Sequence, residues 1–251
     1  MLRHHAAIVA GALFVGCSTS SAPRLDLAGG NPDAGADAGD TRPMLLPGCP
    51  LDPGPPAIEL DRDSPVDPIG GARKFTLEKA LEGYPESEGV LTALITTEKG
   101  TIRCELDEKA APITVANFVG LARGTRPFKK LAGKWTTARF YDGLIWHRVI
   151  PDFVIQGGDQ ARNGTGGPGY DLVEENHVAE PLGTLAMAAS AKPNGSQFYI
   201  VVGKGPEAKY NVFGKCQTET AVAIASEPRH SNDKPIADVH MQRIDIARCS
   251  E

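Results

Sequence analysis

Short runs in which hydrophobic and polar residues alternate recur along the chain, and this is the pattern of half-buried β-strands. Two of them, 91–96 and 101–106, are separated by a short turn that contains Glu, Lys and Gly, which predicts a β-hairpin. Further strand-like runs follow at 144–150, 153–156, 183–188, 197–202, 211–215 and 242–248. Many short strands of this kind predict an antiparallel barrel or sandwich.

Two stretches have the spacing of helices instead. The first is predicted to begin at Pro112, a residue favoured at the first helical position, and to end at Gly124, which suits the left-handed cap of a helix. Its hydrophobic residues recur at helical spacing at Val115, Phe118, Val119 and Ala122. The second helix is predicted over 219–226, with Thr218 as its candidate N-cap.

Aromatic residues divide the chain into two parts. Fourteen of the 15 aromatic residues lie at or after Phe75. The fifteenth, Phe14, lies in the N-terminal apolar run, and none lies between residues 17 and 74. Ten of the 20 prolines lie at or before Pro68. A segment without large hydrophobic side chains cannot bury enough surface to offset its ordering entropy. We therefore expect one globular domain over 75–251, which is long enough for a single core.

The N-terminal part is typical of an exported protein that is held at a membrane. Residues 1–16 carry Arg3 and then an 11-residue apolar run, which is the pattern of a signal peptide and too short to span a bilayer. Cys17 ends the sequence Phe-Val-Gly-Cys, which resembles the bacterial lipobox, and Ser18 after it favours the outer membrane by analogy. We interpret residues 17–74 as a low-complexity, Pro-rich tether. An ordinary signal peptide with an unrelated cysteine is the alternative.

Charge and cysteine content exclude several classes of function. The net charge of −5 at pH 7 argues against a nucleic-acid partner, which requires clustered Lys and Arg. The cysteines besides Cys17 are Cys49, Cys104, Cys216 and Cys249. An exported protein can keep disulfides, and four cysteines allow three pairings among which the sequence does not choose. None of them forms a Cys-x-x-Cys motif, which argues against zinc and thioredoxin-type chemistry.

No sequence motif indicates a cofactor or a metal. The chain has no GxGxxG after a predicted strand, no P-loop, no HExxH and no GxSxG. The glycine-rich run 164–170 lacks the lysine of a phosphate-binding loop, and Pro168 removes a backbone donor, so we expect a structural loop there. We therefore expect an activity that uses neither a cofactor nor a metal.

Two sequence blocks contain the remaining candidate functional residues. Residues 140–160 read FYDGLIWHRVIPDFVIQGGDQ, and residues 185–201 read LAMAASAKPNGSQFYIV. The first block places a cation, Arg148, and an amide, Gln156, in a strongly apolar stretch. Both blocks, and their order relative to the Pro-started helix and a later VFGK segment, resemble the cyclophilins, a family of peptidyl-prolyl cis-trans isomerases. The resemblance covers residues 89–251.

The resemblance implies a fold and a set of site residues. The implied fold is mainly β, a closed eight-stranded antiparallel barrel capped by two α-helices, with the active site in a groove on its outer wall. Arg148 matches the catalytic arginine of the family. The residues expected to bind a proline-containing polypeptide are Phe153, Val154, Gln156, Ala188, Ala189, Gln197, Tyr199 and Tyr210. Tyr199 stands where the family commonly has Phe, and Val154 replaces a longer side chain.

The predicted function is peptidyl-prolyl isomerisation of exported or envelope proteins, without a covalent intermediate. We expect a monomeric enzyme that is anchored through lipid in the outer membrane and faces the periplasm. The alternative is a non-catalytic protein that binds proline-containing segments on the same fold. Segment 205–209 lacks the tryptophan that contacts cyclosporin in eukaryotic cyclophilins, so we expect weak cyclosporin binding. We interpret 125–139 as a loop insertion whose role the sequence does not reveal, and His147 as structural.

Overall fold

The computed structural model describes residues 54–60, 66–85, 88–207 and 210–249. The chain divides into two compact units, Met1–Asp40 and Thr41–Glu251, and every described residue belongs to the second. The predicted signal peptide, the lipidation site Cys17 and Cys49 lie outside the described residues. No helix in the described part of the chain is long and apolar enough to cross a membrane.

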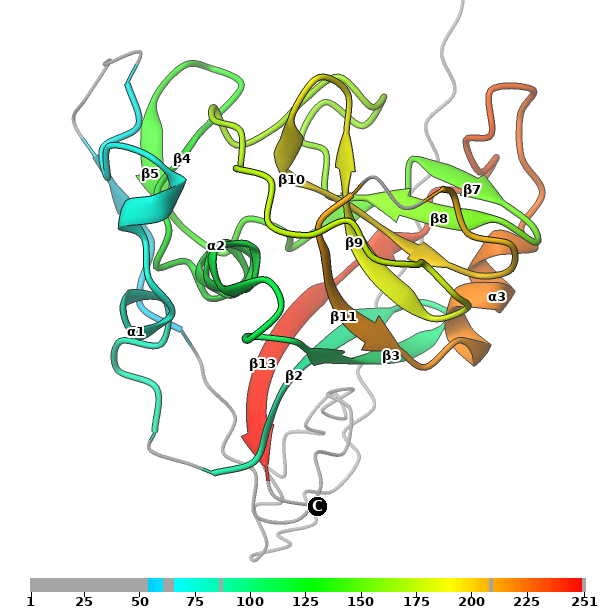
Figure 1. Cartoon of the computed structure of the whole chain (residues 1–251). Helices are drawn as coiled ribbons and strands as arrows, with labels where there is room; N and C mark the ends of the chain where they lie inside the picture. Colours follow the sequence, from blue (N-terminus) through cyan, green and yellow to red (C-terminus); the bar gives the residue numbers. More distant parts are fainter. Residues whose placement is uncertain (1–53, 61–65, 86–87, 208–209, 250–251) are drawn as a thin grey trace, which may run out of the picture. The chain divides into compact units, whose positions relative to one another are not determined.

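An eight-stranded antiparallel sheet forms most of the described unit (Figure 1). Its strand order is β13-β2-β3-β11-β9-β10-β8-β7. The bounds are β2 Val90–Thr97, β3 Gly100–Leu106, β7 Arg148–Ile150, β8 Val154–Gly157, β9 Thr184–Ala189, β10 Pro193–Val201, β11 Val212–Cys216 and β13 Arg243–Cys249. The predicted mainly β architecture and the hairpin formed by β2 and β3 are confirmed.

The sheet is curled but not closed, so the prediction of a closed barrel is wrong. Within the described residues, the edge strands β7 and β13 are not paired with each other, and two short strands, β6 (Leu144–Ile145) and β12 (His240–Met241), form a separate sheet. The backbone N–H groups of Trp146 and Val149 donate instead to the carbonyls of Val239 and Asp233, at 3.0 and 2.8 Å. A loop therefore satisfies the hydrogen-bonding groups that barrel closure would have paired.

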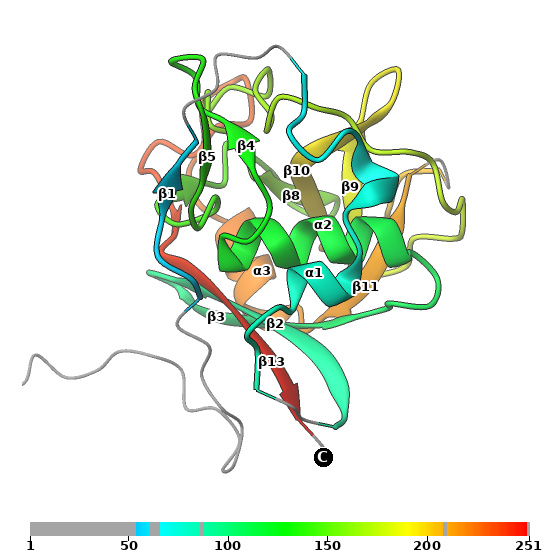
Figure 2. The ribbon, with the colours of Figure 1, turned by 90° about the vertical axis from the view of Figure 1, so that its left-hand side faces the viewer.

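Two helices lie at opposite ends of the curled sheet (Figures 1 and 2). Helix α2 (Pro112–Arg123) ends at Gly124, whose left-handed φ of 88° and N–H bond to the Gly120 carbonyl form the predicted cap. Helix α3 (Glu219–Ala225) follows Thr218, which makes no capping side-chain hydrogen bond within the described residues. A short helix α1 (Leu77–Ala80) and a 3-10 helix η1 (Ala72–Lys74) were not predicted, so the two-helix prediction is incomplete.

Aromatic side chains fill the space between α2 and the sheet. The ring of Phe118 on α2 lies 5.2–5.4 Å from the rings of Tyr141, Phe198 and Phe213. Trp146 packs edge-on against Phe198 at 5.5 Å and is fully buried. This cluster fixes β10 and the adjacent strands from the inner face, which leaves their outer face available for a site.

The packed body begins earlier than the expected boundary at residue 75. Strands β4 (Phe128–Lys129) and β5 (Trp135–Thr137) pair with each other, so the predicted loop insertion 125–139 contains a β-hairpin (Figure 2). Strand β1 (Ile58–Glu59) pairs with β5 and adds a third strand to this hairpin. Farther along, the Asp67 carboxylate accepts two hydrogen bonds from the buried Arg126 guanidinium, at 2.9 and 2.6 Å. Composition could not reveal this ion pair, and the tether prediction is corrected for residues 54–60 and 66–74.

A disulfide joins two neighbouring strands of the large sheet. Cys104 on β3 and Cys216 on β11 stand directly opposite each other in the antiparallel register and are bonded. Their sequence separation is 112 residues. The structure thus selects this pair from the alternatives that the sequence left open.

Candidate functional site

The candidate site is built on one row of residues that crosses neighbouring strands of the sheet. Arg148 on β7 stands opposite Gln156 on β8, and Gln156 stands opposite Tyr199 on β10. Tyr199 is in turn opposite Ala186 on β9. Because side chains directly opposite each other in a ladder share a face, the strand register alone brings a cation, an amide and a phenol together.

The outer face at this row is hollowed into a pocket of about 190 Å³. Its lining residues are Arg148, Phe153, Val154, Gln156, Ala188, Ala189, Tyr199, Pro206 and Tyr210. The apolar part of the wall continues into a small buried cluster that contains Val154, Ala186, Tyr199 and Val201 and is separate from the main core. The pocket therefore combines an apolar floor with polar groups at one side, as small-ligand sites commonly do.

Arg148 lies beside the apolar part of the pocket. Its guanidinium carbon is 5.9 Å from the centroid of the Phe153 ring, and its side chain is 39% exposed. Asp233 Oδ2 lies 3.8 Å from Arg148 Nε, and the same carboxylate lies 3.6 Å from Arg229 Nε. The cation thus remains accessible from the pocket while an acidic side chain holds it from the loop side.

A chain of side-chain hydrogen bonds orients Gln156. Its Nε2 donates to Gln197 Oε1 at 3.0 Å, and Gln197 Nε2 donates to the carbonyls of Gly164 and Gly166 at 2.9 and 2.7 Å. The buried Asp159 carboxylate fixes that glycine loop by accepting from three backbone N–H groups, including that of Gly164 at 2.6 Å. The glycine-rich run is therefore a structural loop, as predicted, and it acts on the pocket through Gln197.

Glycine is required at one position of this loop. A Cβ at Gly166 would collide with the Asp159 carboxylate that organises the loop. The close approach lets the loop carbonyl of Gly166 reach the Gln197 amide. The glycine motif thus has a packing role, and this role explains its small residues without a phosphate ligand.

The structure brings together all but one of the predicted site residues in the pocket wall. The exception is Gln197, which is 3% exposed and supports Gln156 from behind. Three residues near the pocket were not predicted: Pro206 in its wall, Asp233 beside Arg148, and Glu180, which accepts a hydrogen bond from the Tyr199 hydroxyl. They come from irregular segments, where no hydrophobic period marks a residue that faces a site.

His147, the residue before Arg148, is buried and lies outside the pocket lining. In the described part of the chain neither of its ring nitrogens has a hydrogen-bond partner, and burial lowers its pKa, with Asp159 opposing and Arg148 and Lys234 reinforcing that shift. Its side chain does not contribute to the pocket lining that the described residues form. This placement agrees with the structural role expected for it.

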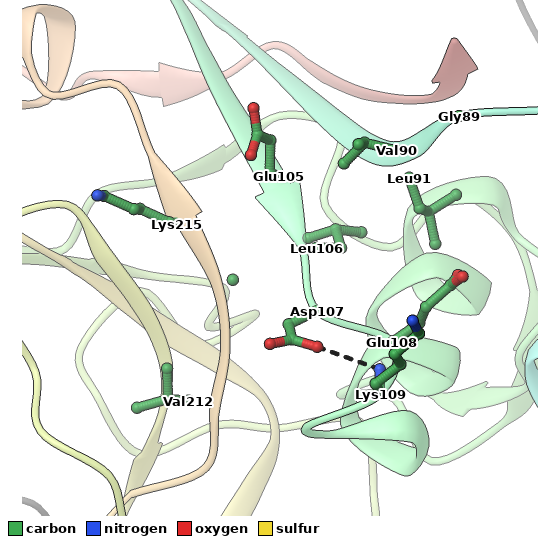
Figure 3. A pocket seen from close by; sticks show the side chains of 11 residues that line it. Gly89, Val90, Leu91, Glu105, Leu106, Asp107, Glu108, Lys109, Val212 and Lys215 are labelled. Carbon is green, nitrogen blue, oxygen red and sulfur yellow. Dashed lines mark hydrogen bonds between the residues drawn. The ribbon is translucent and has the colours of Figure 1, made fainter. Parts of the chain in front are cut away.

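A larger hollow of about 450 Å³ lies elsewhere on the sheet, where β2 begins and β3 ends (Figure 3). Glu105, Asp107 and Lys215 border it, and the Asp107 carboxylate accepts a hydrogen bond from the Lys109 backbone N–H at 3.2 Å. None of the site residues predicted from the sequence is among the described residues that line this hollow. Size therefore does not identify the site, and the smaller pocket with Arg148 is the better candidate.

Comparisons with known proteins agree on one family. Residues 92–246 match the family described as cyclophilin type peptidyl-prolyl cis-trans isomerase/CLD. Peptidyl-prolyl cis-trans isomerase A of Mycobacterium tuberculosis is 41% identical over 167 residues, which cover 62% of this chain and 92% of that protein. Peptidyl-prolyl cis-trans isomerase B of Streptomyces anulatus is 41% identical over 169 residues, which cover 61% of this chain and 95% of that protein. A crystal structure of a cyclophilin type peptidyl-prolyl cis-trans isomerase from Cryptosporidium parvum, in the presence of the dipeptide Ala-Pro, matches with a TM-score of 0.52 and 28% identity, covering 64% of this chain and 99% of that one.

Proposed function

This chain belongs to the cyclophilin-type peptidyl-prolyl cis-trans isomerases and interconverts the cis and trans forms of X-Pro bonds; from that premise we propose that its substrate proline binds in the pocket beside Arg148 and that Arg148 is the catalytic residue. The observation that carries the proposal is the position of the guanidinium, which lies beside Phe153 at the edge of an apolar pocket. The pocket would hold the proline ring against Phe153, Val154 and Tyr199.

The reaction requires rotation about an amide bond and neither makes nor breaks a covalent bond. Rotation in water costs about 18–20 kcal/mol because the resonance of the amide must be lost. In the twisted transition state the proline nitrogen becomes pyramidal and exposes a lone pair, to which Arg148 can donate an N–H. The planar ground state offers no such lone pair, so this hydrogen bond stabilises the transition state selectively. Arginine suits the role because it stays charged at every relevant pH.

The remaining pocket residues would hold the flanking peptide. Gln156, oriented by Gln197, presents its amide to the peptide main chain, and the backbone around Ala188 and Ala189 borders the same pocket. These contacts fix the segments on either side of the bond, so that only the X-Pro bond rotates. The apolar floor excludes water from the proline ring.

An isomerase assay on the full chain with Arg148→Ala tests this assignment. A hydrogen bond from a charged donor contributes about 1.5–3 kcal/mol, so we expect kcat/KM to fall by about 10- to 100-fold. Arg148→Lys should recover part of the loss, because a lysine keeps the charge but not the planar donor geometry. The matched control is Arg103→Ala, an arginine on β3 outside the pocket, which should keep wild-type kcat/KM. Wild-type kcat/KM in Arg148→Ala would contradict the proposal.

We also propose that the enzyme is exported and anchored to the bacterial envelope through lipid on Cys17, with its isomerase domain facing the periplasm. The basic and apolar residues 1–16, followed by the lipobox-like Phe-Val-Gly-Cys, support this proposal. Several acyl chains would hold the protein stably, since each buried CH₂ contributes about 0.8 kcal/mol. Proline-containing exported proteins would be its substrates.

Membrane fractionation tests the anchor separately from the catalysis. Cys17→Ala, or treatment with globomycin, should move the protein out of the membrane fraction. Cys49→Ala is the control, because it removes a cysteine outside the lipobox, and its partitioning should match the wild type. If Cys17→Ala stays in the membrane fraction, the lipid anchor is wrong, whatever the isomerase assay gives.

A further inference from the structure

The floor of the pocket is held from behind by a carboxylate. Tyr199 on β10 donates its hydroxyl hydrogen bond to Oε2 of Glu180, which lies in the segment before β9. Both residues are buried, at 4% and 6% exposure. The pocket lining in the described chain includes Tyr199 but not Glu180. The phenol therefore presents its ring to the pocket and directs its oxygen away from it.

The electrostatics of the pair keep the hydroxyl protonated. Burial raises the pKa of Tyr199, and the Glu180 carboxylate raises it further because a negative neighbour disfavours a phenolate. A neutral hydroxyl that donates to a buried carboxylate forms a charge-assisted hydrogen bond, which is stronger than one between neutral groups. The hydroxyl therefore keeps the proton that it donates to Glu180.

The same segment also supports a second part of the pocket wall. The Glu180 carbonyl lies so close to Gly205 that no Cβ could fit there, and the next residue, Pro206, lines the pocket. The ring of Tyr199 also packs edge-on against Tyr210, with centroids 5.6 Å apart. Glu180 thus lies where the floor and one wall of the pocket meet.

We propose that Glu180 is a positioning residue, which fixes the Tyr199 ring as the floor of the proline pocket by holding its hydroxyl outside that pocket. The proposal rests on the proposed function of this pocket and deepens it. Val154, Ala186 and Val201 belong to the same buried cluster as Tyr199, so a hydroxyl that lost Glu180 would be left buried without this acceptor unless the Tyr199 ring shifted toward the pocket. A ring that shifts into the pocket takes space from the bound proline, and that weakens binding.

A set of variants of the full chain separates this role from general stability. Glu180→Leu removes the acceptor and should raise KM, and the Kd for an Ala-Pro dipeptide, about tenfold, while kcat stays within twofold because Arg148 is untouched. Tyr199→Phe alone should raise KM about fivefold, since it leaves the buried carboxylate without this donor. In the Glu180→Leu background, adding Tyr199→Phe should instead lower KM about fivefold relative to Glu180→Leu alone. The reason is that no hydroxyl without an acceptor remains.

This reversal of sign is the decisive readout. The proposal is overturned if Tyr199→Phe changes KM by the same factor in both backgrounds. If Glu180→Leu does not fold, Glu180→Gln takes its place, and Tyr199→Phe should then raise KM less than twofold in that background; an equal fivefold rise would again refute the pairing. Tyr141→Phe is the matched control, because its buried hydroxyl bonds to the Ser196 carbonyl in the core and its loss should leave KM within twofold.

The Arg148→Ala variant, measured in parallel, keeps the two proposals distinguishable. A loss of kcat/KM in Arg148→Ala together with independent effects at Glu180 and Tyr199 would reject only the positioning role. Wild-type kcat/KM in Arg148→Ala would reject the pocket assignment itself.

Discussion

Asp233 Oδ2 lies 3.8 Å from Arg148 Nε, so a carboxylate accompanies the cation that is proposed to act on the proline nitrogen. The contact is reinforced through the backbone, because the Asp233 carbonyl accepts a hydrogen bond at 2.8 Å from Val149, the residue after Arg148. Asp233 itself has a left-handed φ of 64°, which is uncommon for a residue other than glycine. The loop is therefore shaped to bring its carboxylate to the edge of β7.

We expect Asp233→Asn to lower kcat/KM by about two- to fivefold, since a partly exposed ion pair contributes about 0.2–1 kcal/mol. The neutral amide would orient Arg148 less well, and the guanidinium would sample positions away from the proline nitrogen. An isomerase assay at low and high salt measures the effect, and the wild type should approach the variant as salt rises. Asp238→Asn, whose carboxylate pairs with Lys234 at 3.2 Å, is the control. Equal kcat/KM for Asp233→Asn and wild type at low salt would contradict this prediction.

The pocket wall at Pro206 bears on cyclosporin binding. Family resemblance leads us to expect a tryptophan near this place in cyclosporin-sensitive members, whereas here Pro206 lines the pocket. We therefore expect a Kd for cyclosporin weaker than micromolar. Pro206→Trp should tighten binding by about tenfold or more, because an aromatic ring adds a large apolar contact. Calorimetric titration of both proteins checks this, and a submicromolar Kd for the wild type would refute it.

The sequence predicts what is continuous along the chain and misses what the fold assembles from separate segments. Arg148, Phe153 and Gln156 lie within nine residues of one block, so their joint placement follows from strand alternation and from the family resemblance. Glu180 and Asp233 come from irregular segments, and their partners are fixed by tertiary packing alone. The open edge of the sheet could not be predicted for the same reason. Backbone groups of a distant loop replace the strand pairing that would otherwise close the eight strands into a barrel.

The N-terminal segment should depend on the ion pair between Asp67 and Arg126. Burial alone would raise the pKa of Asp67, but the hydrogen bond and charge of Arg126, with two backbone N–H groups, lower it overall. The stabilisation is therefore complete above the unfolded pKa of 3.8 and is lost as the pH falls through the lower folded value. At neutral pH, Asp67→Asn should cost up to about 3–5 kcal/mol, because Arg126 would stay buried without its partner.

Hydrogen exchange and urea unfolding can measure this loss. The backbone N–H groups of Ile69 and Gly71 donate to the Asp67 carboxylate at 3.0 and 3.1 Å, so their exchange should accelerate in Asp67→Asn. Glu59→Gln is the matched control, since its exposed pair with Lys130 should change the free energy of unfolding by less than about 0.5 kcal/mol. Unchanged exchange at both amides in Asp67→Asn would show that the ion pair does not hold the segment.

The Cys104–Cys216 disulfide should stabilise the domain without affecting catalysis. It closes a loop across 112 residues, and a cross-link of this kind typically contributes about 2–4 kcal/mol. We expect Cys104→Ala, Cys216→Ala and the double variant to lose similar free energies of unfolding, because either substitution breaks the same bond. Their kcat/KM should stay near wild type, since neither cysteine lines the pocket in the described chain. Additive losses in urea unfolding would show that the bond is absent in solution.

His147 should make the folded protein sensitive to mild acid. Burial lowers the pKa of its imidazole below the ordinary value of 6.5; the charge of Asp159 opposes this shift, and the charges of Arg148 and Lys234 add to it. The unfolded chain therefore takes up a proton at a higher pH than the folded one, and stability falls as the pH drops from about 6.5 toward the folded pKa. One such group removes at most about 1.4 kcal/mol for each pH unit in that window. Urea unfolding at pH 7.5 and pH 5 should show a smaller loss for His147→Gln than for wild type, because glutamine does not titrate. The carboxylates titrate alike in both proteins, so the difference isolates His147, and equal losses would mean that its pKa is the same in the folded and unfolded states.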